Sequence, residues 1–592
     1  MENESDPDGR RTRPGHLRGG SASSGGRLSG RSDSTDDHSA RAHRWLDAFF
    51  QAYFSRRPVN ATFMGQHDFD ALLPDFSESG AGDTLSEMRH LLDHAPAAES
   101  IEDPLLSMDV RLASGFLRTQ LWEYGSRHFH LGNPSLYTGE AIFGVLSLLL
   151  TEFAPFERRV ERAVERLHAV PRLLSEARHN VREAPRAWSE RAIRECDGAL
   201  ALLGDGAIIL ALSAGRQAGS LSRAAEVASA AFARYREHLR SALEAMSDEG
   251  VACGEEGLSL HLREGHFLTE SADEVLESAR AELSEATARL TEGARDFGVA
   301  SPAEALAQLA EHHPSEAEYY SRYRGVWEDM RRTAIERDLL TWPDSPIRFS
   351  PQPEWVRGAA PHLYFLFYRS PAAYERPPVH EYLVTPIDES VAPERRLQLL
   401  RTTNDSVIKL NHVIHHGGIG HHVQNWHAFR SKSRIGQVAA VDCAARIALF
   451  CGGTMAEGWA CYATDLMREV GALTPLEEYS ELSTRVRMCA RAAVDVLLHT
   501  GRLDLEGASA LYVREAGMSE AAARAEAVKN SMFPGAALMY QVGTDAIHRL
   551  RRELETSRGP AFSLRKFHDE FLSYGSVPVS LIGEAMKRPH AE

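Results

Sequence analysis

Histidine is concentrated in one short segment of this 592-residue chain, between Asn411 and His427. The segment reads NHVIHHGGIGHHVQNWH and holds imidazoles at His412, His415, His416, His421, His422 and His427. Neutral imidazole is the commonest protein ligand of zinc and similar metals, and this density is unusual for the interior of a helix. The segment therefore indicates a site for one zinc-like divalent ion.

Spacing determines which of these histidines could share an ion. A zinc-peptidase helix presents two histidines at positions i and i+4, on one face, and His412 and His416 have that spacing. His415 and His421 lie about 240° apart on an ideal helix, so they could meet only if the turn between them is distorted. The three glycines between them allow such a distortion. Both pairs remain open on spacing alone.

A third ligand for such an ion stands downstream, at Glu457 in the sequence MAEGWA. The segment begins an apolar-periodic stretch that runs to about Val470. A carboxylate on a second helix, facing two histidines, completes the His₂Glu ligand set of zinc hydrolases. Taken alone, the Glu-Gly-Trp-Ala motif is a weak signal.

Arg491, Asp495 and His499 recur at every fourth position of a predicted helix over Thr484–Thr500. One interpretation is an Arg–Asp ion pair on a helix face, which would contribute only about a few tenths of a kcal/mol. The neighbouring positions are apolar, however, which predicts a buried helix whose charges require partners. This favours support of a metal ligand or recognition of a substrate carboxylate.

Tyr540 lies in a predicted apolar helix that follows Pro534 and Gly535. A phenol close to the metal could donate a hydrogen bond to a developing oxyanion. An ordinary core tyrosine would need only a hydrogen-bond partner. The sequence leaves both interpretations open.

The elements that position these groups are predicted to be helices. The apolar spacing predicts long helices at Phe156–Val170 (ended by Pro171), Ser220–Met246, Ser271–Phe297 and Ser315–Leu340, and helices again from Pro393 to the end. Between Pro343 and Pro386 the chain is proline-rich, and two β-like runs, His362–Tyr368 and His380–Pro386, predict a small hairpin or edge sheet. The expected fold class is mostly α, a large helical body with a deep central cleft and a small β element.

Composition divides the chain into a tail and a body. Residues 1–40 are rich in Gly, Ser, Arg and Asp and are expected to be disordered, because they cannot bury enough apolar surface. Residues 41–342 form a predicted N-terminal helical region. Residues 343–592 form the predicted metal-site region, packed with the former as one body.

Charge and hydropathy exclude several classes of partner. The formal net charge of -17 argues against a nucleic-acid-binding surface. We find no run of about 18 apolar residues, no apolar core of a secretion signal, and cysteines too few for a disulfide framework. We therefore expect a cytoplasmic protein without a membrane partner, acting on a small molecule or peptide. The sequence does not determine an oligomeric state.

Several motifs carry a resemblance to a known family. Val413–Gln424 reads VIHHGGIGHHVQ and Glu457–Tyr462 reads EGWACY. They resemble the bacterial domain-of-unknown-function 885 family, whose motifs read V-I-H-E-G-x-P-G-H-H-x-Q and E-G-W-A-x-Y. The resemblance covers about residues 43–590 and includes Arg491–Asp495 with His499, Phe533–Gly535 with Tyr540 and Gly543, and Phe567–Asp569 with Gly575–Pro578.

The resemblance implies a gluzincin-like zinc-peptidase site. His415 and His421 are then the imidazole ligands, Glu457 is the carboxylate ligand, and His422 is a neighbour. The family has a glutamate after the first ligand, which would act as the base that activates the attacking water. This chain has His416 at that position, with Gly418 and Ile419 as further departures from the motif.

Two functions follow from this substitution. In the first, the protein is a metal-dependent hydrolase of peptidase type that acts on a small peptide or amide, with His416 in place of the glutamate. In the second, it is a non-hydrolytic relative, a ligand-binding protein or a biosynthetic enzyme, that keeps the metal pocket. Imidazole has a suitable pKa for a base, but its reach differs from that of a carboxylate, and position comes before pKa.

Overall fold

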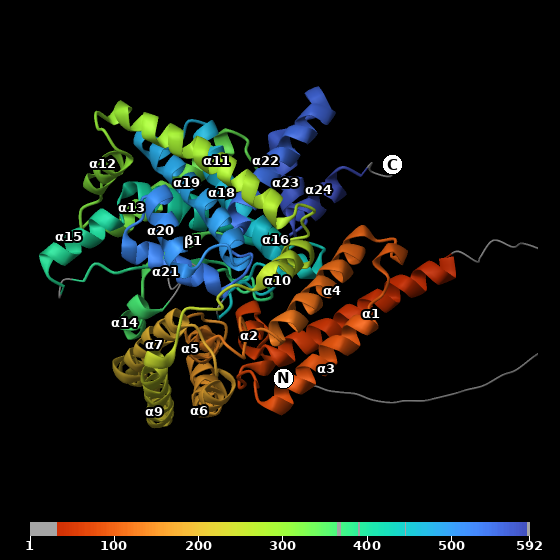
Figure 1. Cartoon of the computed structure of the whole chain (residues 1–592), viewed down its shortest axis with the longest axis vertical. Coiled ribbons are helices and arrows are strands. Elements are labelled where there is room, and N and C mark those ends of the chain that lie inside the picture. Colours follow the sequence, from red (N-terminus) through yellow and green to blue (C-terminus); the bar gives the residue numbers. More distant parts are fainter. Residues whose placement is uncertain (1–31, 364–368, 389–390, 445, 589–592) are drawn as a thin grey trace, which may run out of the picture.

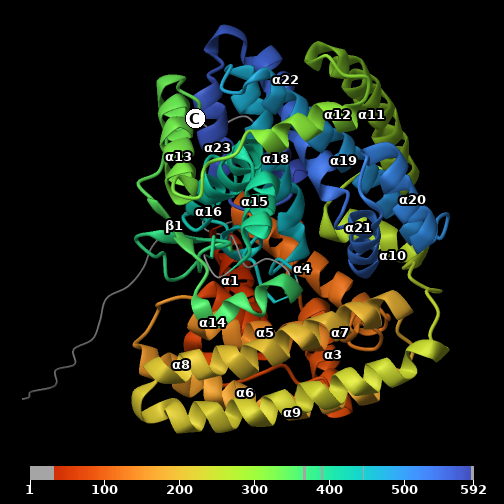
Figure 2. The same ribbon diagram turned by 90° about the vertical axis from the view of Figure 1, so that its left-hand side faces the viewer.

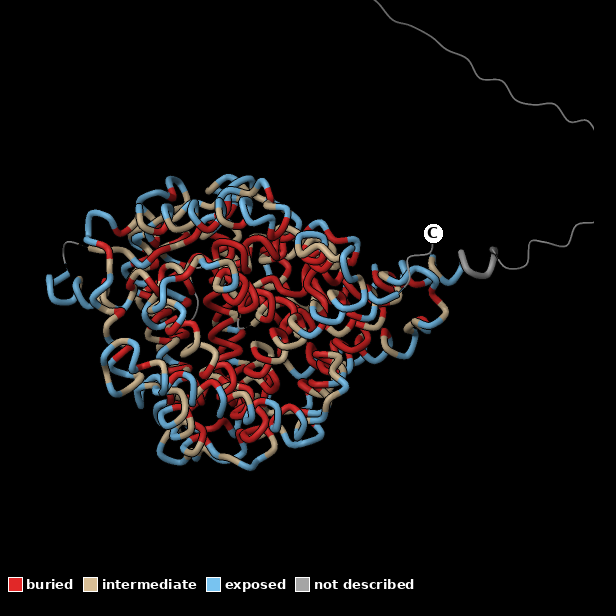
Figure 3. The backbone as a smooth tube through the Cα atoms, turned by 90° about the horizontal axis from the view of Figure 1, so that it is seen from above, coloured by how far each residue is buried: buried red, intermediate tan, exposed pale blue. Residues whose placement is uncertain are grey.

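The computed structural model describes residues 32–363, 369–388, 391–444 and 446–588 (Figure 1). It confirms the predicted fold class, because helices dominate and a single small two-stranded sheet is present in the described part of the chain. Buried segments gather in the middle of the body, and exposed ones cover its outside (Figure 3). One hydrophobic core cluster runs from Ala42 to Met586, so the N-terminal and C-terminal regions share a core.

The first half of the chain forms two groups of helices. Orange helices α1, α3 and α4 pack together in one group, and α5 to α9 form a layer along one side (Figure 2). Their bounds are α1 (Ser32–Arg56), α2 (Pro58–Met64), α3 (Glu78–Asp93), α4 (Pro104–Tyr124), α5 (Pro134–Leu149), α6 (Phe156–Asn180), α7 (Arg186–Ala201), α8 (Ala207–Ser213) and α9 (Ala218–Ala242).

The second half surrounds α18, against which α22 packs, while α11 packs along α19. The remaining helices are α10 (Gly254–Leu260), α11 (Ala272–Gly293), α12 (Pro302–Ala307), α13 (Tyr319–Glu336), α14 (Glu354–Arg357), α15 (Pro393–Thr402), α16 (His421–Ala428), α17 (Arg434–Val438), α18 (Gly453–Glu469), α19 (Pro475–His499), α20 (Leu505–Ala516), α21 (Glu520–Met532), α22 (Met539–Arg558), α23 (Leu564–Ser573) and α24 (Val579–Met586).

The predicted helix boundaries differ most from the observed ones at α1 and α6. Helix α1 begins at Ser32, inside the segment expected to be disordered. Helix α6 continues through Pro171 to Asn180. The proline removes one hydrogen bond to Leu167, but the buried apolar stripe continues on both sides of it, so packing holds the helix together.

The predicted small β element is present, but it is a parallel sheet and not a hairpin of the two predicted runs. Strand β2 (His380–Val384) lies within one predicted run, but it pairs in parallel with β1 (Ile347–Pro351) rather than with the other run. Of that other run, His362 ends a short 3₁₀ turn, and residues 364–368 lie outside the described residues. A parallel pair requires a long connection, which the proline-rich segment provides.

One apolar stretch passes the length and composition test for a membrane span. It covers residues 186–213, with a mean hydropathy of 1.6, and contains α7 and α8. About half of its most apolar part is buried, and α7 packs against α5 and α9. Core helices of soluble proteins pass the same test, so this stretch by itself is weak evidence for a membrane span.

Deletion of residues 1–40 is expected to leave the melting temperature within about 2 °C of the native value. The reason is that residues 37–41 are not buried, and Ala42 is the first buried residue among those of α1 whose burial the structure describes. Deletion of residues 1–50, a matched control, removes the buried Leu46 and Phe49 and should lower the melting temperature by several degrees. Thermal unfolding followed by circular dichroism checks both. A loss of several degrees in the shorter deletion would show that this segment packs on the body.

Candidate metal centre

The histidine-rich segment is a wide helical turn that ends in a break. Residues Val407–Gly417 form a π-helix, the chain turns through Gly418 and Gly420, and α16 begins at His421. A Cβ atom on Gly420 would lie 2.0 Å from the carbonyl oxygen of His415, so only glycine fits there. The break brings the rings of His415 and His421 to a centroid distance of 4.9 Å. This is the distortion that their spacing requires.

The Glu-Gly-Trp motif of α18 brings the carboxylate to these rings. Gly458 lies so close to Gly543 of α22 that a Cβ atom would meet its backbone at 2.5 Å. Trp459 donates a hydrogen bond from Nε1 to the carbonyl of Ile419 at 2.8 Å, which fastens α18 to the glycine turn. Glu457 therefore faces both imidazoles.

The donor atoms fit a tetrahedral metal ion. Oε2 of Glu457 lies 3.4 Å from Nε2 of His415 and 3.5 Å from Nε2 of His421. Charged hydrogen bonds are shorter, about 2.7–2.9 Å. Two donors bound at about 2.0–2.1 Å to one tetrahedral zinc ion are separated by about 3.3–3.4 Å. Oε2 is buried and has no hydrogen-bond partner among the described residues, as expected of a ligand atom.

The protonation states suit a ligand set. Burial opposes ionisation of Glu457, but His421 and His415 outweigh it and hold the pKa of the carboxyl well below its ordinary value. Burial lowers the pKa of His415. The pKa of His421 is raised despite its burial, because Glu457 attracts the charged form. The carboxylate is thus ionised and ready to bind a cation.

His416 is the third imidazole that faces this centre. One nitrogen atom from each of His415, His416 and His421 lies within 4.8 Å of the others. Nδ1 of His416 lies 2.6 Å from the carbonyl oxygen of Asn411. A carbonyl only accepts, so Nδ1 carries the proton and Nε2 carries the lone pair. The position of the missing glutamate is filled by a nitrogen that can accept a proton or bind a metal.

The rival pair does not form. His412 turns toward the small sheet, where its Nδ1 lies 2.5 Å from the hydroxyl of Tyr382. His422 donates from Nε2 to the carbonyl of Ser345 at 2.7 Å and is a neighbour of the site, as expected. The three-imidazole cluster includes His416 but excludes His412.

The three clustered imidazoles and Glu457 line a cavity of about 600 Å³ inside the body, the predicted cleft. The cavity reaches from α5 and α7 to the C-terminal helices, and Tyr540 and Arg491 also border it. Small-molecule sites usually enclose about 300–1,000 Å³. The space is therefore large enough for a short peptide.

The model of a family described as bacterial protein of unknown function (DUF885) matches residues 58–586. The chain belongs to this DUF885 family. A comparison with curated proteins finds no match.

Two solved structures resemble this DUF885 protein. One, a "putative lipoprotein of unknown function" from Shewanella oneidensis, matches with a TM-score of 0.73 and 21% identity, over 92% of this chain and 100% of that one. The other, a "putative lipoprotein" from Colwellia psychrerythraea, matches with a TM-score of 0.73 and 16% identity, over 93% and 98%. The shared fold therefore spans nearly the whole chain.

The descriptions of these two structures contradict the cytoplasmic location expected from the sequence. Lipoproteins are held at a membrane by a covalent lipid. The lack of an apolar core near the first residue was too weak a basis for that expectation, which is withdrawn.

Of the three residues that recur on α19 of the DUF885 protein, only Arg491 borders the cavity. It does not pair with Asp495. Its Nε donates to Oε1 of Glu526 at 2.7 Å, and its guanidinium lies 5.0 Å from the ring centroid of Tyr540. The hydroxyl of Tyr540 has no hydrogen-bond partner in the part of the chain that is described, although its ring borders the cavity. A hydrogen-bond partner within the protein, which an ordinary core tyrosine would need, is thus absent among the described residues, and the role of Tyr540 as an oxyanion donor stays a prediction.

Asp495 and His499 act behind the cavity. Asp495 accepts hydrogen bonds from the backbone amides of Gly535, Ala537 and Leu538 at 2.8–3.0 Å. It thereby fixes the turn that leads into α22, the helix that carries Tyr540. His499 is fully buried and donates from Nε2 to the carbonyl of Asn530 at 3.0 Å.

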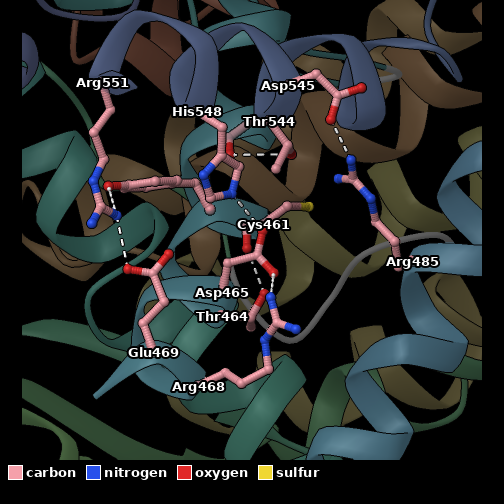
Figure 4. A network of polar contacts seen from close by, with 12 residues as sticks. Cys461, Thr464, Asp465, Arg468, Glu469, Arg485, Thr544, Asp545, His548 and Arg551 are labelled. Atoms are coloured by element: carbon pink, nitrogen blue, oxygen red, sulfur yellow. Dashed lines mark hydrogen bonds and ion pairs between the residues drawn. The ribbon is translucent and has the colours of Figure 1, made fainter. Parts of the chain in front are cut away.

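A polar network fastens α18 to its neighbours (Figure 4). Asp465, about two turns after Glu457, accepts a hydrogen bond from His548 of α22 at 2.8 Å. Arg485 of α19 pairs with Asp545 of α22. These contacts hold the carboxylate-bearing helix in place.

Sequence reasoning missed Arg487 and Lys529, which also line the cavity. Arg487 precedes Arg491 by one helical turn, and that spacing was the one available signal. Arg-rich helix faces are usually solvated, so the spacing alone does not separate this arginine from the many others.

Proposed function

We propose that the protein is a metal-dependent hydrolase of peptidase type, which acts slowly on a small peptide or amide. The observation that carries this proposal is the pair of distances, 3.4 and 3.5 Å, from Oε2 of Glu457 to the two imidazoles. His415, His421 and Glu457 would hold one zinc or similar ion. Three protein ligands leave a fourth position open, as in catalytic zinc sites.

When bound, the ion supplies a Lewis acid that polarises the substrate carbonyl and makes water a better nucleophile. Side chains of the protein would carry out the proton transfer and stabilise the oxyanion. His416 keeps its Nδ1 proton on the carbonyl of Asn411, and its Nε2 accepts the proton that the attacking water loses. Tyr540 donates a hydrogen bond to the developing oxyanion.

Turnover is expected to be slow because the ring of His416 is held in one position. Its ring is held by Asn411, and a base must lie within hydrogen-bond reach of the proton it accepts. A flexible carboxylate can adjust to that distance, whereas a ring fixed at one nitrogen cannot.

The test is zinc-dependent turnover of a panel of short peptides and amides, with released amines measured by mass spectrometry. The protein is first treated with a chelator and then reloaded with zinc. We expect weak cleavage that disappears with the chelator, returns with zinc and is absent from the Glu457→Gln variant. Zinc-loaded protein that cleaves no member of the panel would contradict the proposal.

A second candidate is a binding protein that keeps the metal without hydrolysis. It is favoured by the convergence of three imidazoles within 4.8 Å. If His416 binds the ion together with the other three donors, four protein ligands complete the shell, as in structural zinc sites. The His416→Ala variant separates the candidates. Zinc affinity should be retained if His416 is a base and should fall at least tenfold if it is a ligand.

A further inference from the structure

Arg487 is a cation that forms no ion pair with any described residue. It lines the metal cavity from α19, yet no described residue hydrogen-bonds to its guanidinium or forms an ion pair with it. Other arginines of the same helix are paired: Arg485 with Glu282 and Asp545, and Arg491 with Glu526. Arg487 is half-buried, and a charge partly withdrawn from water is normally partnered, because an unpaired one is costly.

The surroundings of Arg487 increase that cost. Burial and repulsion from Arg491 lower the pKa of Arg487, and the attraction of Glu526 only partly offsets them. The carboxylate of Glu526 already accepts from Arg491 at 2.7 Å. Lys529 borders the same part of the cavity, so three cations (Arg487, Arg491 and Lys529) face it.

A second carboxyl group that lines the cavity from α19 does not pair with Arg487. Glu481 also lines the cavity, but burial raises its pKa to about 8, so most of it is protonated at neutral pH. Its contact is with Arg468, at 3.8 Å. Glu481 therefore does not pair with Arg487, and neither does any other carboxylate in the part of the chain that the structure describes.

Arg487 lines the same cavity as the candidate metal centre. Residues Ser480, Thr484, Arg487 and Arg491 recur at helical spacing and all line the cavity, so one face of α19 borders it over about 16 Å. Tyr540 lines the cavity together with Glu457, and its ring lies 5.0 Å from the guanidinium of Arg491, so it stands between the two ends. A short peptide could reach from the metal donors to Arg487.

We propose that Arg487 binds a carboxylate of the substrate and thereby selects peptides that carry one near the bond to be cleaved. This inference rests on the proposed function for the identity of the substrate, since the anionic groups of a peptide are carboxylates. A guanidinium presents two parallel N–H groups that match a carboxylate. The carboxylate belongs either to the C-terminus of the peptide or to an acidic side chain.

Binding of three peptides, measured by calorimetry, tests the proposal. They are tetra-alanine, tetra-alanine amide, and the amide with glutamate as its last residue. The full-length protein is used both zinc-loaded and zinc-free, because zinc itself could bind a carboxylate. Native protein should bind at least one acidic peptide roughly 10- to 100-fold more tightly than the neutral amide, with and without zinc. Arg487→Gln should remove the preference, and Arg487→Lys should restore part of it.

Which acidic peptide is preferred identifies the source of the carboxylate. Equal binding of all three peptides, no measurable binding of any, or a preference that survives in Arg487→Gln would overturn the inference. Binding does not depend on cleavage, so an acid preference without turnover would contradict the hydrolase alone. Turnover without an acid preference would contradict only the role of Arg487.

Thermal unfolding separates this role from a structural one. Arg487→Gln should leave the melting temperature unchanged or raise it, because it removes a repulsion and no partner. The matched variant Arg491→Gln, one turn away, should lower it, because Glu526 loses its ion pair. A loss in Arg487→Gln as large as that in Arg491→Gln would show that Arg487 is part of the framework and would overturn the proposal.

Discussion

Replacement of His416 by glutamate is expected to raise the rate of peptide hydrolysis by about two orders of magnitude, while zinc content stays unchanged. A glutamate side chain at this position has no hydrogen bond to the carbonyl of Asn411 to hold it, since both are acceptors. It can therefore turn toward the ligand cluster, where the ring of His416 now lies 4.6 Å from that of His415. Initial rates on the best substrate of the panel check the prediction.

Two controls distinguish a better base from a mere change of pocket shape. His416→Gln has nearly the same size as the glutamate variant but no proton-accepting charge, and it should be no faster than native protein. Zinc content must be equal in all three proteins. If native protein is efficient and the glutamate variant is slower, imidazole is the working base and the slow-turnover account is wrong.

Replacement of Glu457 or His421 by alanine is expected to abolish zinc binding, because two remaining donors make an incomplete shell. Zinc affinity should fall at least about 100-fold, measured by competition with a chelating dye. Each of the two variants has a matched control at a residue of the same type that is not a proposed ligand. His422→Ala removes a buried imidazole that donates to Ser345, and Glu481→Gln removes a buried carboxyl of the same cavity. Both controls should retain zinc.

Zinc that persists at full stoichiometry in both Glu457→Ala and His421→Ala would disprove this ligand set. Loss in either control would show that general damage to the cavity, rather than loss of a donor, controls the metal. Melting temperatures measured without zinc identify such damage directly.

The helical body was predictable because apolar periodicity and capping residues act locally. The capping box of Ser271 and Glu274, for example, is present in α11. The errors lie where tertiary packing prevails over local preference. Pro171 is accommodated because buried residues on both sides of it hold α6 together. Strand β1 was missed because Ile347–Pro351 is short and ends in proline.

The candidate site was predictable in its composition but not in its arrangement. Spacing alone left His412 with His416 as a rival pair, whereas in the fold His412 contacts Tyr382 of a distant strand and lies outside the three-imidazole cluster. The resemblance named His415, His421 and Glu457. It gave no indication of Arg487, since the lack of a partner depends on every side chain that the fold brings near.

The location of a bound zinc ion tests the central claim most directly. A crystal of zinc-loaded protein, measured on both sides of the zinc absorption edge, gives the ion's position independently of activity. The account predicts one anomalous peak about 2.0–2.2 Å from Nε2 of His415, Nε2 of His421 and Oε2 of Glu457. The absence of a peak between these three atoms, or a peak held by other residues, would contradict it.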